Sequence, residues 1–118
     1  MTMNLTRASE APAYTAPRHH GAHTVRLQGH EAGCTERFWV GVSRYRPGGV
    51  AETAPTQEET VYVLLDGELV ITTGGKEIVL GRLDSMHFAR GELRSIQNRS
   101  DREALLLVTV AHPPAERP

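Results

Sequence analysis

Two glycine-containing turns between β-rich segments constrain this chain more than any other feature. Segment 60–65 (TVYVLL) is followed by Asp66-Gly67 and then by segment 68–73 (ELVITT), after which Gly74-Gly75 leads into 76–80 (KEIVL). Asp-Gly and Gly-Gly supply the positive φ angles that tight hairpin turns require. We therefore predict three consecutive antiparallel strands here.

Further short β-rich segments lie on both sides of these turns. They are 22–28, 36–46, 85–89, 93–98 and 104–111. Pro47-Gly48-Gly49 predicts a turn that ends the second of them. No segment of ten or more residues has the 3.6-residue periodicity of a helix. About eight or nine short strands with frequent turns predict an all-β sandwich or barrel.

The length and the composition of the two ends predict one domain. A chain of 118 residues has the size of a single ordinary domain. Residues 1–18 contain proline, alanine, threonine and serine and are expected to form an irregular arm. Residues 19–112 are expected to form one β-barrel domain. Residues 113–118 are a proline-rich tail, because proline cannot continue the last strand.

Charge and apolar segments argue against two classes of partner. The formal net charge is −1, from 13 basic and 14 acidic residues, whereas nucleic-acid binders usually carry a basic surplus. The longest apolar stretches, 61–65 and 104–111, are far shorter than the roughly 20 residues of a membrane-spanning helix. Residues 1–11 lack the apolar core of a secretory signal. We expect no nucleic acid or membrane partner and a cytoplasmic location.

Two segments have the spacing of known family motifs. Residues 59–69 (ETVYVLLDGEL) are similar to the second half of the first motif of the cupin superfamily, and Gly91 and Asn98 have the spacing of its second motif. The resemblance covers about residues 37–110. It implies a small jelly-roll (cupin) β-barrel that binds a small molecule and is commonly a homodimer.

The positions that hold metal ligands in this family carry other residues. The two histidines of the first motif fall near Ala54 and Thr56, its glutamate falls on Thr60, and the histidine of the second motif falls on Arg94. Alanine has no donor atom, a neutral hydroxyl is a weak ligand, and a guanidinium repels a cation. We therefore expect a degenerate metal site and no cofactor.

Arg94 is expected to enter the barrel where relatives have a metal ligand. A guanidinium in an apolar barrel requires a partner. An anionic ligand could supply this partner, and so could an internal ion pair with Glu52 or Glu59. If the strand has a different register, Arg94 would instead point into solvent. We expect a small carboxylated ligand. The other expected ligand-binding residues are Tyr62, Thr60, Thr56, Trp39, Tyr45, Met86 and Phe88, with core packing as the alternative for the last two.

Whether the protein is an enzyme stays open at this point. Without a redox centre, isomerase- or lyase-type proton transfer fits best, with Glu52, Glu59 and His87 as catalytic candidates. If Met86 and Phe88 face the cavity, His87 faces away from it.

Two alternatives remain. The first is a metal-dependent cupin enzyme, in which relocated ligands hold a divalent transition metal. Its candidate ligands are His19, His20, His23, Glu52, Glu59 and His87. The second is a non-catalytic sensing or structural protein.

Overall fold

The computed structural model describes residues 3–114, which form nine strands and two short 3-10 turns. The 3-10 turns are η1 (Ala8–Glu10) and η2 (His30–Ala32). The strands are β1 (Ala13–Tyr14), β2 (His19–Gln28), β3 (Phe38–Pro55), β4 (Thr60–Asp66), β5 (Leu69–Thr73), β6 (Lys76–Leu80), β7 (Ser85–Phe88), β8 (Leu93–Gln97) and β9 (Ala104–Ala111). The all-β prediction, with eight or nine strands, is confirmed.

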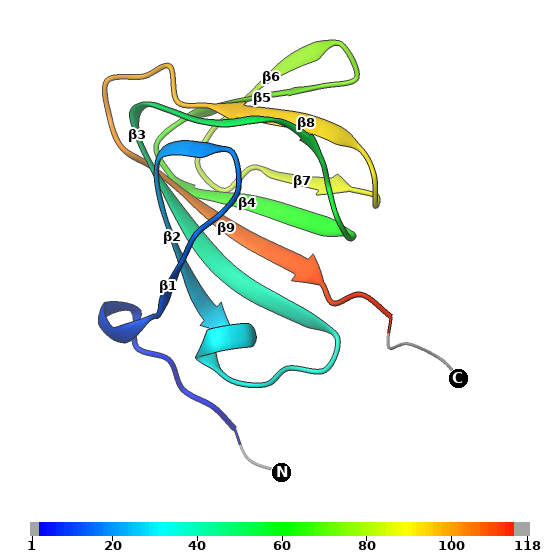
Figure 1. Cartoon of the computed structure of the whole chain (residues 1–118). Coiled ribbons are helices and arrows are strands. Elements are labelled where there is room, and N and C mark those ends of the chain that lie inside the picture. The colour runs from blue at the N-terminus through cyan, green and yellow to red at the C-terminus, as the bar shows by residue number, and fades with distance from the viewer. Residues whose placement is uncertain (1–2, 115–118) are drawn as a thin grey trace.

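The strands form one curved antiparallel sheet that wraps into a barrel (Figure 1). Its order is β6-β5-β8-β3-β9-β4-β7, and β2 adds to β3 while β1 adds to β2. Strands β8 and β4 are separated by β3 and β9 in this order, so they face each other across the barrel. Side chains from both strands can therefore meet in the interior.

One of the two predicted hairpins is wrong. Strands β5 and β6 pair through Gly74-Gly75, as expected, with Thr73 opposite Lys76. Strand β4, however, pairs with β7 and β9, while β5 pairs with β6 and β8. The Asp66-Gly67 turn therefore carries the chain from one side of the barrel to the other, although Gly67 does have a positive φ of 83°.

The turn predicted at Pro47-Gly48-Gly49 bends β3 without ending it. Residues 38–45 of β3 pair with β9, whereas residues 50–55 pair with β8. Between them, the Gly48 N–H donates to the Asn98 carbonyl and the Asn98 N–H donates to the Gly49 carbonyl, both at 2.9 Å. These bonds hold the bend where the strand exchanges one partner for another, and Gly48 has a positive φ of 82° there.

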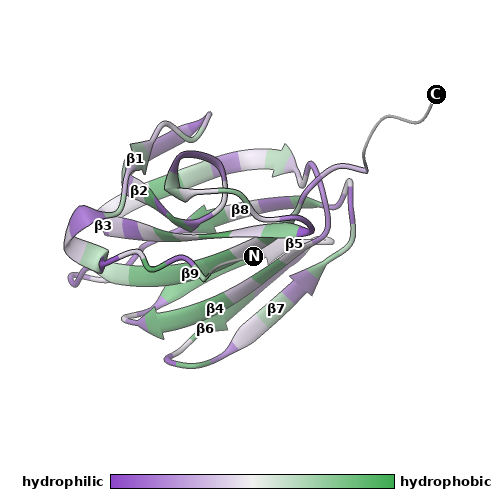
Figure 2. Cartoon of the chain, turned by 90° about the horizontal axis from the view of Figure 1, so that it is seen from below, coloured by the Kyte–Doolittle hydropathy of each residue, from purple (hydrophilic) through white to green (hydrophobic). Residues whose placement is uncertain are grey.

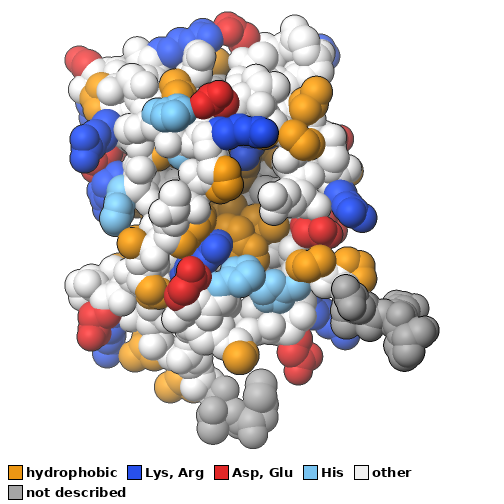
Figure 3. Space-filling model, in the orientation of Figure 1, with side chains coloured by type: hydrophobic (Ala, Val, Ile, Leu, Met, Phe, Trp, Pro, Cys, Tyr) orange, Lys and Arg blue, Asp and Glu red, His pale blue; other side chains and the backbone are white. Residues whose placement is uncertain are grey.

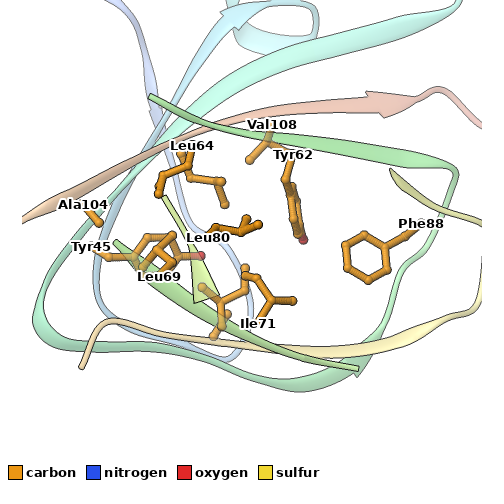
Figure 4. Close-up of a cluster of buried hydrophobic side chains, with 12 residues drawn as sticks. Tyr45, Tyr62, Leu64, Leu69, Ile71, Leu80, Phe88, Ala104 and Val108 are labelled. Carbon is orange, nitrogen blue, oxygen red and sulfur yellow. The ribbon is translucent and has the colours of Figure 1, made fainter. Parts of the chain in front are cut away.

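The core lies inside the barrel and includes Tyr62, Leu64, Ile71 and Phe88. Alternation in β4 buries Thr60, Tyr62 and Leu64 and leaves the residues between them half-exposed. Figure 2 shows that β4 and β9 are largely hydrophobic while the loops are hydrophilic. In Figure 4 the Tyr62 ring points from β4 into this core, and its centroid lies 5.4 Å from that of Phe88.

The N-terminal arm is more regular than expected. It contains η1 and β1, in which Ala13 and Tyr14 pair with Val25 and Thr24 of β2. Of the proline-rich tail predicted at 113–118, residues 115–118 lie outside the described part of the chain. Within residues 3–114, no helix has the length and apolar character needed to cross a bilayer. The homodimer and the cytoplasmic location stay predictions.

Candidate functional site

A cavity of about 320 Å³ opens into the barrel between the N-terminal arm and the inner faces of the strands. Figure 3 shows hydrophobic side chains at the bottom of a central hollow, with basic and histidine side chains near its rim. The arm contributes residues 14–18 to the wall. The strand residues that line it are His19, Arg26, Trp39, Ser43, Tyr45, Ala54, Pro55, Thr60, Tyr62, Arg94, Ile96, Leu106, Val108 and Val110. Thr56 and Gln57, between β3 and β4, complete the wall.

Six of the expected ligand-binding residues lie in this wall. Arg94 lies there with Tyr62, Thr60, Thr56, Trp39 and Tyr45. They come from three strands, β3, β4 and β8, and from the loop between β3 and β4. Inward positions alternate along each strand. Their role in binding stays a prediction.

Met86 and Phe88 are not part of the wall. Phe88 is fully buried beside Tyr62, and Met86 is half-buried against the same core. Both side chains therefore pack in the core, which was the alternative given for them. Strand β7 lies beyond β4 at the edge of the sheet, away from the cavity.

Arg94 reaches across the cavity to Tyr62. Its Nε–H donates a hydrogen bond to the Tyr62 phenolic oxygen at 2.9 Å, and its Nη1 donates to the Glu52 carbonyl oxygen at 3.3 Å. Among the described residues, no carboxylate forms an ion pair with this guanidinium. The internal ion pair considered for Arg94 is therefore absent there, and the wall presents a cation.

The two candidate carboxylates are paired with histidines outside the cavity. Glu52 Oε2 lies 2.5 Å from His20 Nε2, and Glu59 Oε2 lies 2.7 Å from His87 Nε2. All four side chains are exposed. Since Thr60 and Phe88 point inward, their neighbours Glu59 and His87 point outward, so neither reaches the cavity.

His19 is the histidine that the fold brings to the cavity. It is half-buried, its ring centroid lies 6.2 Å from that of Tyr45, and Nδ1 lies 2.8 Å from the Pro17 carbonyl oxygen. A carbonyl only accepts, so Nδ1 carries the hydrogen and Nε2 of the neutral ring keeps a free lone pair. Burial first, and then the charge of Arg94, lower the pKa of His19.

Sequence reasoning missed Arg26, which also lines the cavity and lies between two aromatic rings. Its guanidinium carbon is 3.5 Å from the Tyr14 ring centroid and 4.2 Å from that of Trp39, and Nε donates to Glu31 Oε1 at 2.9 Å. The alternation of segment 22–28 could have revealed this inward position. The arm was expected to be irregular, so Tyr14 had no predicted neighbour.

The residues present do not fit the family's metal ion. Ala54 and Arg94 lie opposite each other in β3 and β8, and Thr56 and Thr60 are buried in the same wall. A methyl group, two neutral hydroxyls and a guanidinium offer no donor set for a divalent cation.

The relocated ligand set is not assembled either. His19 faces the cavity, His20 pairs with Glu52, and His23 is exposed. No group of three or more His, Cys, Asp or Glu side chains within residues 3–114 is placed to hold a metal ion.

Comparison with known proteins agrees with this architecture. The cupin domain family matches residues 41–110. A Mycobacterium tuberculosis protein named Beta-D-galactosidase Rv1717 is 74% identical over 114 residues, which are 97% of this chain and 98% of that protein.

Two solved structures share the fold at lower identity. The polyketide cyclase RemF from Streptomyces resistomycificus has a TM-score of 0.82 at 18% identity, over 96% of this chain and 83% of that one. A predicted oxalate decarboxylase from Thermotoga maritima has a TM-score of 0.77 at 21% identity. The match covers 94% of this chain and 100% of that one. Identities this low support the fold alone. The fold and the family match agree: the chain belongs to the cupin family.

Proposed function

We propose that this protein hydrolyses β-D-galactosides and that the barrel cavity is its sugar site. The observation that carries the proposal is the 74% identity, over nearly the full length of both chains, to a protein named as a β-D-galactosidase. The cavity is chemically suited to a sugar. Thr56, Thr60 and Tyr62 offer hydroxyl groups, and Leu106, Val108 and Val110 offer apolar surface for sugar C–H groups.

The absence of wall carboxylates is the main difficulty for this proposal. Most glycoside hydrolases use a pair of Asp or Glu side chains that flank the scissile bond. No described Asp or Glu side chain lines this cavity. Hydrolysis at this site therefore requires other groups to move the protons.

The test compares the two anomers of one substrate. Protein purified without an affinity tag is expected to hydrolyse 4-nitrophenyl β-D-galactopyranoside and to leave the α-anomer intact. Ala54→Phe, which places a ring in the cavity wall, is expected to lower kcat/KM at least 10-fold with an unchanged circular dichroism spectrum. The exposed change Arg82→Ala serves as control. Equal rates for wild type and Ala54→Phe would place the activity elsewhere.

A second candidate function is binding of a carboxylated small molecule, and Arg94 is the observation that favours it. The wall contains the arginines Arg18, Arg26 and Arg94 and, among described residues, no acidic side chain. A carboxylate would accept the guanidinium N–H groups of Arg94 in a bidentate pair. Such a ligand would undergo isomerase- or lyase-type proton transfer, without a metal.

Ligand-induced thermal shifts separate the two candidates. A panel of small organic acids is expected to raise the melting temperature of wild type and of Arg82→Ala, but not of Arg94→Ala, if the ligand is carboxylated. A shift with galactose and none with the acids favours the galactosidase. No shift with either class, together with no hydrolysis, would leave the non-catalytic alternative. Trp39 is the single tryptophan and lines the cavity, so its fluorescence offers a second readout.

A further inference from the structure

The hydrogen bonds of His19 and Tyr62 leave one free proton acceptor and one free proton donor at the same cavity. His19 Nδ1 donates to the Pro17 carbonyl, which fixes the ring so that Nε2 carries the lone pair. Among the described residues, no hydrogen bond engages this Nε2. Tyr62 accepts the Nε–H of Arg94 through its oxygen, so its own hydroxyl hydrogen is available for donation.

Arg94 links these two groups. It hydrogen-bonds Tyr62 directly, and its charge also acts on His19, which lies near it in the cavity wall. A guanidinium N–H that already points at the Tyr62 oxygen would stabilise the negative charge left there when the phenol gives up its proton. The same positive charge favours the neutral, proton-accepting form of His19.

We propose that His19 and Tyr62 are the proton-transfer pair of this cavity, with His19 as general base and Tyr62 as general acid of glycoside hydrolysis. This inference rests on the proposed function. Water loses a proton to His19 Nε2 as its oxygen forms a bond to the anomeric carbon. The bond from that carbon to the leaving oxygen breaks, its electron pair stays on that oxygen, and the oxygen takes the Tyr62 proton. Exchange with solvent then restores both residues.

Direct attack by water displaces the leaving group once, which inverts the anomeric carbon. The first sugar released from a β-D-galactoside is therefore α-D-galactose. Proton NMR of the fresh product distinguishes the two anomers before they equilibrate. Release of the β-anomer first would contradict a single displacement and overturn the proposed pair.

The groups that face His19 set the pH dependence. They are Arg94 from β8, Tyr45 from β3, His20 on its own strand and the Pro17 carbonyl from the arm. Burial and Arg94 lower the pKa of His19, so its base form is present at neutral pH. We expect kcat/KM to fall at acidic pH as His19 becomes protonated, and the acidic limb to disappear in His19→Gln.

The closing experiment measures kcat/KM for two leaving groups. The substrates are 4-nitrophenyl and 2,4-dinitrophenyl β-D-galactopyranoside, and the second leaves with little need for an acid. His19→Gln is expected to lose about 100-fold or more on both substrates, the range typical of general acid–base catalysis. Tyr62→Phe is expected to lose about 100-fold on the first and less than about 10-fold on the second. His23→Gln, an exposed histidine of the same strand, is expected to match wild type.

Each failure has its own signature. Wild type that hydrolyses neither galactoside removes the proposed function and this pair with it. Active wild type with an active His19→Gln, and loss of activity in Glu52→Gln or Glu59→Gln, overturns the pair and leaves the function intact. Thermal melts of every variant separate loss of catalysis from loss of folding. A variant with a native melt and lost activity counts as a catalytic effect.

Discussion

The Arg94 Nε–H and the Tyr62 phenolic oxygen form a 2.9 Å hydrogen bond that crosses the interior of the barrel. The two residues belong to β8 and β4, which are not neighbours in the sheet. The family motif that this chain resembles implies a metal ligand at the position of Arg94. In this chain the cross-barrel connection is made by a guanidinium and a phenol, both of which line the cavity.

The cross-barrel bond is expected to contribute measurably to stability. Tyr62 is buried and a hydrogen bond to a charged donor contributes about 1.5–3 kcal/mol. A double-mutant cycle with Tyr62→Phe and Arg94→Met, followed by urea unfolding, is expected to give a coupling energy of about 1–2 kcal/mol. Free-energy changes that add within about 0.3 kcal/mol would show that the bond contributes little in solution.

Metal chelation is expected to leave the protein unchanged. Because Ala54, Thr56, Thr60 and Arg94 offer no donor set, EDTA should not alter the melting temperature, and elemental analysis should find much less than one equivalent of divalent metal. One tightly held equivalent of iron, zinc, manganese or nickel would contradict this.

Restoring the family's ligands is the complementary prediction. The combined variant Ala54→His, Thr56→His, Thr60→Glu, Arg94→His is expected to gain stability with Zn²⁺, by about 2.7 kcal/mol at 100 times the Kd. A triple variant that keeps Arg94 is the matched control, and its guanidinium should prevent most of the gain. Equal stabilisation of both variants by Zn²⁺ would show that the ion binds elsewhere.

The sequence predicted the barrel because its signals are local. The Gly74-Gly75 hairpin and the alternation in β4 depend on neighbours in the chain, and both are present in the structure. The β4–β5 hairpin failed because an Asp-Gly turn specifies a change of direction and not the pairing partner. Only the other strands, far away in sequence, determine that β4 pairs with β7 and β9.

The cavity residues on β4 and β8 could be predicted from the sequence, whereas those of the N-terminal arm could not. The alternation of inward and outward positions predicted Tyr62 and Thr60 in the wall, and the family motif predicted Arg94 there. The role of His19 depends on the Pro17 carbonyl two residues before it, a contact that no spacing pattern reveals. Glu52 and Glu59 were predicted as catalytic candidates because they lie near a motif, but they pair with His20 and His87 outside the cavity.

Stability is expected to fall as the pH drops below about 6.5, the ordinary histidine pKa. Burial lowers the pKa of His19 and of His30 in the folded protein, so the unfolded chain binds protons more readily. The contribution of the two neutral histidines to the unfolding free energy is therefore complete above the histidine pKa of the unfolded chain. It is lost as the pH falls from that value to the lower pKa of the folded protein. His19→Gln should flatten the decline in the unfolding free energy, measured by urea titration across this range. His23→Gln, the exposed control, should retain the wild-type slope; equal slopes for all three proteins would contradict the prediction.

The two glycine turns are expected to differ in their tolerance of a side chain. Gly67 and Gly74 both have positive φ angles, 83° and 56°, which cost an ordinary L-residue about 1–2 kcal/mol. A Cβ at Gly67 would also lie 2.7 Å from the Glu103 carbonyl oxygen and 2.8 Å from the Ala104 Cα, whereas nothing lies within 4 Å of one at Gly74. Gly74→Ala should therefore destabilise by about 1 kcal/mol and Gly67→Ala by more than about 2 kcal/mol. Urea midpoints measure both changes, provided that the slope of the transition is unchanged. Equal costs would mean that the start of β9 moves away from Gly67 at little expense, and that this turn does not fix the crossing between the two sides of the barrel.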